Sequence, residues 1–390
     1  MRQRIALLGS TGSIGEQTLD VAADHAELFE VVALTAHRNW RRLAEQARTV
    51  LPDSVAIADK AFYPALKEAL ADLPIKVYAG SDAVAQLAAA PGSDTVVNAL
   101  VGYAGLAPSV ETLRAGKKLA LANKESLVVA GERVMELVEK HRAPLVPIDS
   151  EHSALLQCLA GERSAVRRLI LTASGGALRD LPAAALEEVT PEQALRHPNW
   201  QMGAKITIDS ATLVNKGFEV IEARWLFGVE ADRIDVLIHP QSIIHSMVEF
   251  MDGSVKAQLG TPDMRLPIQY ALTFPDRLGR PTEPFPFLEH PELTFRAVDR
   301  RRYPALDLAY DCLRRGGNAC CVMNGANEVA VAAFLEGRIG FLDIVRTIER
   351  TLDRVAFEPH PDLSVYDASD KEARRVAASL LVKEKSKQSF

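Results

Sequence analysis

The sequence IALLGSTGSIG, residues 5–15, decides the fold class because it joins an apolar run to a glycine-rich turn and the start of a helical pattern. Its glycines stand at Gly9, Gly12 and Gly15, a GxxGxxG spacing. In doubly wound α/β folds, such glycines permit a tight turn and close approach of a pyrophosphate to the helix N-terminus. A simple tight turn would also use glycine, but the flanking strand and helix favour dinucleotide binding.

The rest of the N-terminal third alternates apolar runs with helical patterns. Residues 16–25 and 39–51 have helical spacing, and their alternation with strands implies a parallel sheet with right-handed crossovers. We therefore expect an N-terminal Rossmann-like doubly wound parallel sheet. The candidate strands are residues 4–9, 31–36, 54–59, 95–101, 119–123 and 144–149.

The end of the second candidate strand bears on the choice of dinucleotide. NAD-selective folds commonly place an acid there, whereas an arginine suits the 2′-phosphate of NADP. The sequence reads Ala36-His37-Arg38-Asn39 and has no carboxylate, so it favours NADP. The alternative is that Arg38 is an ordinary solvated loop residue.

Composition excludes several classes of protein. A chain of 390 residues suggests two or three domains, and a net charge of −6 gives no basic surplus for nucleic acid. The short apolar stretch before the glycines leads us to expect neither a signal peptide nor a membrane span. Four cysteines without a C-x-x-C pair fit a reducing cytoplasm.

Two acids follow the sixth candidate strand, where ligands bind in parallel sheets. Within PIDSEHS, residues 147–153, Asp149 and Glu151 stand one residue apart. On an extended segment they would point the same way, and such a pair of carboxylates favours Mg²⁺ or Mn²⁺. The alternative is a helix N-terminus, with Asp149 or Ser150 as its cap and Glu151 near the positive end of the dipole.

Residues 207–227 read TIDSATLVNKGFEVIEARWLF, and an amphipathic helix is predicted within this stretch. Asp209 or Ser210 could cap its N-terminus. Its apolar stripe comprises Val214, Phe218, Ile221 and Trp225.

The same helix carries polar residues suited to an anion. Ser210, Asn215 and Lys216 offer hydrogen-bond donors to a phosphate, and Glu219 would complete a carboxylate cluster. The alternative is a surface ion pair between Lys216 and Glu219 at i,i+3.

Two loops add candidates. The glycine turn SGG, residues 174–176, is either a second phosphate nest or a loop that requires glycine geometry. HPNWQMG, residues 197–203, places His197, Trp200 and Met202 in a candidate lid, or in a packed connection.

Together with further segments, these stretches resemble the 1-deoxy-D-xylulose 5-phosphate reductoisomerase family over almost the whole chain. The matching segments are GSTGSIG (9–15), LANKES (121–126), DSEH (149–152), SGG (174–176), HPNWQMG (197–203), DSATLVNKGFEVIEARWLF (209–227), HPQSIIHSMVEF (239–250), AQLGTPDMRLPI (257–268) and MNGANEVAVAAF (323–334).

The resemblance implies an oxidoreductase that uses NADPH and a divalent cation (Mg²⁺, Mn²⁺ or Co²⁺) on a phosphorylated ketose, working as a homodimer. It implies rearrangement and reduction of 1-deoxy-D-xylulose 5-phosphate to 2-C-methyl-D-erythritol 4-phosphate, in non-mevalonate isoprenoid precursor biosynthesis. The residue chemistry agrees, since an α-hydroxyketone rearrangement needs both oxygens held on one Lewis acid.

The resemblance also implies roles for individual residues. Lys124, Glu151, His197 and Trp200 would be catalytic. The cofactor would contact Thr11, Gly12, Ser13, Ile14, His37, Arg38, Asn39, Asn123, Glu125 and Gly203. The substrate would contact Lys124, Ser150, Glu151, Ser174, His197, Ser210, Asn215, Lys216 and Glu219. The metal ligands would be Asp149, Glu151 and Glu219.

One departure from the family pattern lies after the second candidate strand. Members commonly carry Gly-Lys-Asn where this chain has His37-Arg38-Asn39. Arginine keeps a phosphate-binding charge, but His37 in place of glycine changes the expected contacts at the adenosine end.

The remaining sequence completes the expected domain organisation. Residues 1–149 form the NADPH-binding domain, 150–274 a central α+β catalytic and dimerisation domain, 275–303 a proline-rich linker, and 304–390 a helical bundle. The bundle shows four helical patterns and no motif beyond Asn324 and Asn327, so we expect it to support the site rather than to catalyse.

Two other functions fit parts of the pattern. One is a different NADP enzyme, such as a semialdehyde or homoserine dehydrogenase; the former needs a nucleophilic cysteine beside a base, and Cys158 lacks that signature. The other is a non-catalytic dinucleotide sensor, which would not need three carboxylates beside a phosphate nest.

Overall fold

The computed structural model describes residues 1–200, 202–279 and 285–385. The chain forms two compact units. The first comprises Met1–Ser126, Val134–Ser153 and Asp263–Pro281, and the second Leu127–Arg133, Ala154–Pro262 and Thr282–Phe390. Most of the predicted central domain and all of the predicted bundle fall in the second unit, and the four-part division stays a prediction. Among the described residues, no helix is both long and apolar enough to cross a membrane.

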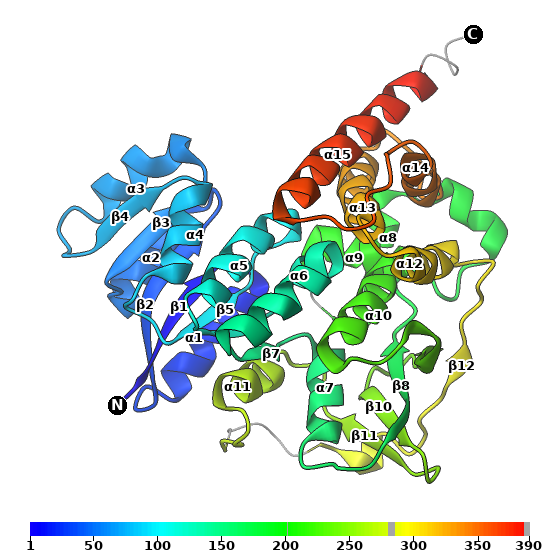
Figure 1. Ribbon diagram of the computed structural model, residues 1–390, viewed down its shortest axis with the longest axis horizontal. Coiled ribbons are helices and arrows are strands. Elements are labelled where there is room, and N and C mark those ends of the chain that lie inside the picture. The colour runs from blue at the N-terminus through cyan, green and yellow to red at the C-terminus, as the bar shows by residue number, and fades with distance from the viewer. Residues whose placement is uncertain (201, 280–284, 386–390) are drawn as a thin grey trace. The chain divides into compact units, whose positions relative to one another are not determined.

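The first unit is built on a seven-stranded parallel sheet, which confirms the predicted Rossmann-like fold (Figure 1). The strand order is β4-β3-β2-β1-β5-β6-β7. Because β1 lies between β2 and β5, the order reverses there, and ligands bind doubly wound sheets at this reversal. The strands are β1 (Gln3–Leu8), β2 (Phe29–Ala36), β3 (Ser54–Ile57), β4 (Lys76–Ala79), β5 (Thr95–Asn98), β6 (Lys118–Leu121) and β7 (Leu145–Pro147).

Six of these strands match the predicted ones, and β4 was missed. β4 is a four-residue edge strand, KVYA, whose side chains alternate between exposed and half-buried. Such a strand has no continuous apolar run, so its sequence lacks the signal that marked the buried strands.

Helices connect and cover the strands of the first unit. One of them, α11, comes from residues far along the chain and packs against α1 and β6. Gln269 on α11 is hydrogen-bonded to His25 at 3.0 Å, and Lys118 Nζ donates to the carbonyl of Leu272 at 2.9 Å. The helices are α1 (Ser13–Asp24), α2 (Trp40–Val50), α3 (Tyr63–Ala69), α4 (Ser81–Ala89), α5 (Leu106–Arg114) and α11 (Arg265–Thr273), with short 3₁₀ turns η1 (Lys60–Phe62) and η2 (Gly102–Gly105). Two further helices, α6 (Glu125–His141) and α7 (Ser150–Leu159), have residues in both units.

The second unit contains a five-stranded mixed sheet, so the predicted α+β centre is confirmed. Its order is β11-β10-β8-β9-β12; β8 and β9 are parallel, and the other pairs are antiparallel. One core cluster joins strand residues such as Leu171 and Val236 to Val220 on α10 and Leu306 on α12. The strands are β8 (Val166–Ala173), β9 (Ile234–Ile238), β10 (Ile244–Phe250), β11 (Val255–Leu259) and β12 (Arg296–Ala297).

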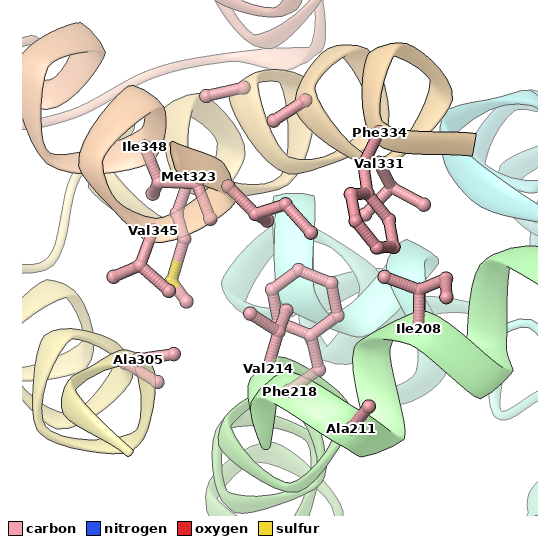
Figure 2. Close-up of a cluster of buried hydrophobic side chains, with 14 of the residues drawn as sticks. Ile208, Ala211, Val214, Phe218, Ala305, Met323, Val331, Phe334, Val345 and Ile348 are labelled. Atoms are coloured by element: carbon pink, nitrogen blue, oxygen red, sulfur yellow. The ribbon is translucent and has the colours of Figure 1, made fainter. Parts of the chain in front are cut away.

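The four predicted C-terminal helices are confirmed, and they share a core with α9 and α10. Figure 2 shows Ile208 and Phe218 pointing toward Val331 and Phe334 of α13. This burial ties the bundle to the helices that carry candidate site residues. The helices are α8 (Pro191–Ala194), α9 (Ala204–Thr212), α10 (Val214–Phe227), α12 (Pro304–Arg315), α13 (Ala319–Leu335), α14 (Asp343–Leu352) and α15 (Leu363–Lys385), with 3₁₀ turns η3 (Ala183–Glu188), η4 (Ala231–Arg233) and η5 (Phe287–Glu289).

The predicted start of the helix at Asp209 or Ser210 is wrong. The chain forms α9 and α10 instead, separated at Leu213, which has a left-handed backbone with φ 59°. Because α9 begins at Ala204, Asp209 lies inside a helix and is buried, so it is not an N-cap. The predicted apolar stripe is confirmed, with Phe218 and Ile221 fully buried.

Candidate active site

The glycine turn after β1 is shaped by close backbone packing. Gly9 has φ 82°, and a Cβ there would lie 2.7 Å from the carbonyl oxygen of Ala99, which follows β5. A Cβ on Gly15 would lie 2.3 Å from the carbonyl oxygen of Gly9. These two glycines are therefore required by the protein's own packing, at the reversal of strand order.

Gly12 is different, because the protein itself leaves room for a side chain. A Cβ there would lie 3.5 Å from the carbonyl oxygen of Gly9, an ordinary contact. Gly12 is the N-cap of α1, and no side chain of the described residues caps that helix. Gly12 and Ser13 are exposed, and Thr11 and Ile14 are half-exposed. The Gly12 N–H donates to the carbonyl of Gly9 at 3.1 Å, so the donors that suit a pyrophosphate are the N–H groups of the first turn of α1, which have no partner within the helix.

The three residues that follow β2 are exposed, and one of them, Arg38, is positively charged. The Arg38 side chain is 68% exposed, and its Nε lies 3.0 Å from Oδ2 of Asp59. The backbone N–H of Ala61, together with Arg38, lowers the pKa of the Asp59 carboxyl. Asp59 follows the neighbouring strand β3, so sequence reasoning confined to the end of β2 missed it. His37 is exposed, and Asn39 caps α2 by accepting from the backbone N–H of Arg42.

The β6–α6 connection is fixed by a buried asparagine. The Asn123 amide donates to the carbonyls of Leu100 and Gly102 and to the carboxylate of Glu125, and it accepts from Ser126. Asn123 and Glu125, both predicted at the cofactor, therefore brace the loops after β5 and β6.

The acids after β7 lie at a helix start, so the extended alternative is wrong. Asp149 precedes α7, whose first residues include Ser150 and Glu151. Lys124 Nζ lies 2.5 Å from Oδ2 of Asp149, and both side chains are largely buried. Ser150 Oγ donates to Glu151 at 2.5 Å.

Asp149 and Glu151 together fit a hard cation. Each offers a carboxylate oxygen, and these atoms lie within 4.8 Å of each other. Mg²⁺ and Mn²⁺ prefer such oxygen ligands. His152, fully buried with Nδ1 3.8 Å from Oδ2 of Asp149, was not among the predicted residues. Its position three residues after an acid at a helix start is the signal that could have identified it.

In the second unit, Glu219 is held on α10 by its predicted neighbours. Asn215 Nδ2 donates to Oε1 of Glu219 at 2.5 Å, and the Lys216 ammonium pairs with Oε2. Lys216 and Glu219 are buried, so this is not the surface ion pair of the alternative interpretation. A buried carboxylate with cationic and amide partners can remain charged.

The loop at 197–200 orients His197 toward the glycine turn at 174–176. His197 Nδ1 accepts from the backbone N–H groups of Asn199 and Trp200, at 3.2 and 3.0 Å. The neutral ring therefore carries its proton on Nε2, which lies 3.0 Å from Ser174 Oγ and donates to it. Asn199 anchors the loop by donating to the carbonyl of Pro240 at 2.7 Å. Of the candidate lid HPNWQMG, Gln201 lies outside the described residues.

The glycine turn also packs on α9. Gly176 has φ 72°, and a Cβ there would lie 2.7 Å from the carbonyl oxygen of Ser210, in the last turn of α9. The second unit thus brings Ser174 and His197 into contact and packs their turn on Ser210, with Asn215 and Lys216 just beyond the helix break. Trp200 lies at the loop, 6.1 Å between ring centroids from His245, and Gly203 is the exposed N-cap of α9.

Sequence reasoning missed the buried network around Asp209. Lys205 Nζ lies 2.8 Å from Oδ2 of Asp209, and Asn327 Nδ2 donates to Oδ1 at 2.9 Å. Helical spacing could have paired Lys205 with Asp209 at i,i+4, but nothing local links either residue to Asn327.

Comparison with known proteins covers nearly the whole chain. The family model for 1-deoxy-D-xylulose 5-phosphate reductoisomerase matches residues 5–131. The model for the C-terminal domain of 1-deoxy-D-xylulose 5-phosphate reductoisomerase matches residues 145–227, and a further model, for the DXP reductoisomerase C-terminal domain, matches residues 259–376. Relatives of the same name in Bacteroides thetaiotaomicron and Bacteroides fragilis are 55% and 54% identical, over 97% and 98% of this chain and 98% and 99% of theirs.

Solved structures agree with these matches. The reductoisomerase from Zymomonas mobilis in complex with NADPH has a TM-score of 0.91 and 45% identity, covering 98% of this chain and 99% of that one. A DOX-P reductoisomerase in complex with NADPH, fosmidomycin and magnesium has a TM-score of 0.93 and 37% identity, with the same coverage. The protein belongs to the 1-deoxy-D-xylulose 5-phosphate reductoisomerase family.

Proposed function

We propose that this protein catalyses the NADPH- and divalent-metal-dependent rearrangement and reduction of 1-deoxy-D-xylulose 5-phosphate to 2-C-methyl-D-erythritol 4-phosphate. The reaction serves non-mevalonate isoprenoid precursor biosynthesis. The observation that carries this proposal is the family match over nearly the whole length, with relatives above 50% identity.

NADPH binds along the ends of the first-unit strands. Backbone N–H groups at Thr11, Ser13 and Ile14 would hold the pyrophosphate at the N-terminus of α1, while Gly12, whose N–H donates to the carbonyl of Gly9, leaves room for its approach. The exposed guanidinium of Arg38 binds the 2′-phosphate, with His37 and Asn39 beside the adenosine. Asn123 and Glu125 hold the loops after β5 and β6 in place. Gly203 is a further residue expected to contact NADPH.

By the family resemblance, Asp149, Glu151 and Glu219 would hold the divalent cation, Mg²⁺, Mn²⁺ or Co²⁺. When bound, the ion supplies a Lewis acid that polarises the ketone and hydroxyl oxygens of the substrate. Asn215 and Lys216 both contact the Glu219 carboxylate and fix its position on α10. The Lys124 ammonium pairs with Asp149 and is placed to move a proton at a substrate hydroxyl.

The substrate phosphate is bound by Ser174, His197, Ser210, Asn215 and Lys216. His197 presents Nε2–H because its Nδ1 accepts from the loop backbone. Ser174 Oγ accepts from His197 and from the N–H of Gly176, so its own hydroxyl proton is available to a phosphate oxygen. Ser150 and Glu151 contact the sugar end, and Trp200 covers the substrate when the loop closes and excludes water.

We also propose a cytoplasmic homodimer. Four buried free thiols support a reducing compartment. Large apolar side chains exposed on the second unit, including Met251, Phe287 and Leu288, support burial against a second copy.

The direct test is oxidation of NADPH, followed by absorbance, with 1-deoxy-D-xylulose 5-phosphate and Mg²⁺ or Mn²⁺. We expect turnover that stops when the metal is chelated and returns when it is restored. A dinucleotide sensor would bind NADPH without turnover, and that outcome would reject the enzyme.

A further inference from the structure

The C-terminal helix α13 contains a buried polar residue that the proposed chemistry does not use. Asn327 is fully buried among apolar neighbours of the core, including Met323, Ala330 and Val331. Its Nδ2 donates to Asp209 at 2.9 Å, and its Oδ1 has no hydrogen-bond partner within the described part of the chain. Burying an amide with one atom unsatisfied is unfavourable, so an apolar side chain would suit packing better.

The partner of Asn327 is a buried carboxylate that needs compensation. Asp209 is 1% exposed, and Lys205 on the same helix lies 2.8 Å from Oδ2. Lys205 Nζ in turn lies 5.3 Å from the ring centroid of Phe218 on α10. Asp209 therefore links α9 to α13 directly and to α10 through Lys205.

Asp209 immediately precedes Ser210 in the last turn of α9. The carbonyl of Ser210 packs against Gly176 of the glycine turn at 174–176. The chain then breaks at Leu213 and places Asn215 and Lys216 in the first turn of α10. The rotation of α9 therefore sets where Ser210 stands relative to the other phosphate-binding side chains, and Asn327 restrains that rotation from α13.

We propose that Asn327 is a positioning residue for substrate phosphate, acting through Asp209 on Ser210 and the α9–α10 junction. This inference rests on the proposed function. It gives the C-terminal helices a defined part in substrate affinity, in addition to their share of the core.

The same helix supplies a closely matched control. Asn324 lies one turn before Asn327 and is also fully buried. Its Nδ2 donates to the carboxylate of Glu328 at 2.9 Å, and its Oδ1 likewise has no hydrogen-bond partner among the described atoms. Glu328 lies on α13 itself, so this bond does not reach α9. Asn324→Leu and Asn327→Leu therefore make the same chemical change at the same depth.

The test compares both variants with the wild type by steady-state kinetics and thermal unfolding. We expect both to shift the unfolding temperature similarly, while Asn327→Leu alone raises KM for 1-deoxy-D-xylulose 5-phosphate by about tenfold, with KM for NADPH unchanged. Equal substrate KM values for the two variants would overturn the inference alone. Absence of turnover by the wild type would overturn the proposed function, and the inference with it.

A charge swap provides a second test should Asn327→Leu not fold. Asn327→Asp sets two carboxylates against each other and should raise substrate KM. Adding Asp209→Asn restores one N–H···O bond with its direction reversed. The double variant should therefore recover part of the lost affinity, and a double variant no better than Asn327→Asp contradicts the proposal.

Discussion

Replacing the glycines of the turn after β1 by alanine should separate the needs of the fold from those of the cofactor. At Gly15 an added Cβ would lie 2.3 Å from the carbonyl oxygen of Gly9 and 2.5 Å from Cα of Ser10, against an ordinary contact of at least 3.4 Å. Both neighbours are backbone, so α1 would have to move by about 1 Å, which is overpacking.

The magnitude follows from two opposing terms. Overpacking of this kind costs about 1–3 kcal/mol, whereas alanine in a helix gains about 1 kcal/mol over glycine. Because both clashing atoms are backbone, the cost lies at the upper end of that range, so Gly15→Ala should destabilise by about 2 kcal/mol and lower the unfolding temperature by several degrees. It should also weaken NADPH binding, because the turn is displaced.

Gly12→Ala should behave differently. Its Cβ meets nothing closer than 3.5 Å, and the backbone at φ −88° and ψ 170° is open to alanine. The unfolding temperature without cofactor should stay within about 1 °C, since a slightly poorer N-cap is offset by reduced freedom of the unfolded chain. A methyl group in the path of the pyrophosphate should remove charge-assisted hydrogen bonds worth about 2–3 kcal/mol, an affinity loss on the order of 100-fold.

The assays are thermal unfolding without cofactor and titration of NADPH followed by its fluorescence. Gly92→Ala serves as control, because a Cβ there meets no atom within 4 Å and the residue lies away from the turn. We expect that control to change neither quantity. Unaltered NADPH affinity in Gly12→Ala, or an unchanged unfolding temperature in Gly15→Ala, would refute the division of roles.

Three further predictions follow from the geometry. Arg38→Ala should raise KM for NADPH far more than for NADH, and equal increases would leave Arg38 a solvated loop residue. Glu219→Gln should abolish metal-dependent turnover and leave NADPH binding intact, while the exposed Glu230→Gln changes neither; turnover surviving in Glu219→Gln would remove it from the metal ligands. Burial lowers the pKa of His239 in the folded protein. Below about pH 6.5 the unfolded chain therefore binds more protons than the folded one, and the free energy of unfolding decreases as the pH is lowered. Urea unfolding between pH 7 and 5 should show a steeper loss for wild type than for His239→Asn, and parallel losses would exclude this residue as a cause.

The elements predicted correctly are those whose signals are local. The strand before Gly9 is a buried apolar run, and the helix after it begins at a glycine turn, so adjacent residues were enough. β4 lies at the sheet edge and needs only a few half-buried side chains, so nothing in KVYA distinguishes it from a loop. Its existence depends on pairing with β3, which is a tertiary contact.

In the candidate site, too, features with a local sequence signal were predicted and features that depend on tertiary contacts were not. The spacing of Asp149 and Glu151 allowed either a cation site or a helix N-terminus, and the three metal ligands, with Glu219 among them, were implied by the family resemblance. The partners that hold site residues could not be identified in this way. Asp59 reaches Arg38 from the neighbouring strand, and Asn327 reaches Asp209 across 118 residues of sequence. Hydrogen-bond partners that the fold brings together leave no periodic pattern.

The break between α9 and α10 is a further feature that the sequence did not predict, and its cause is physical. A left-handed residue is usually glycine or asparagine, because other side chains lose about 1–2 kcal/mol there. The chain places a leucine at position 213, with φ 59°, in the core beside Val220 and Tyr310. Burying a leucine is worth about 2–5 kcal/mol relative to alanine, more than the strain it carries. Packing therefore outweighs backbone preference at this residue, and with leucine instead of glycine or asparagine at position 213 the sequence carries no signal for the turn that separates Ser210 from Asn215.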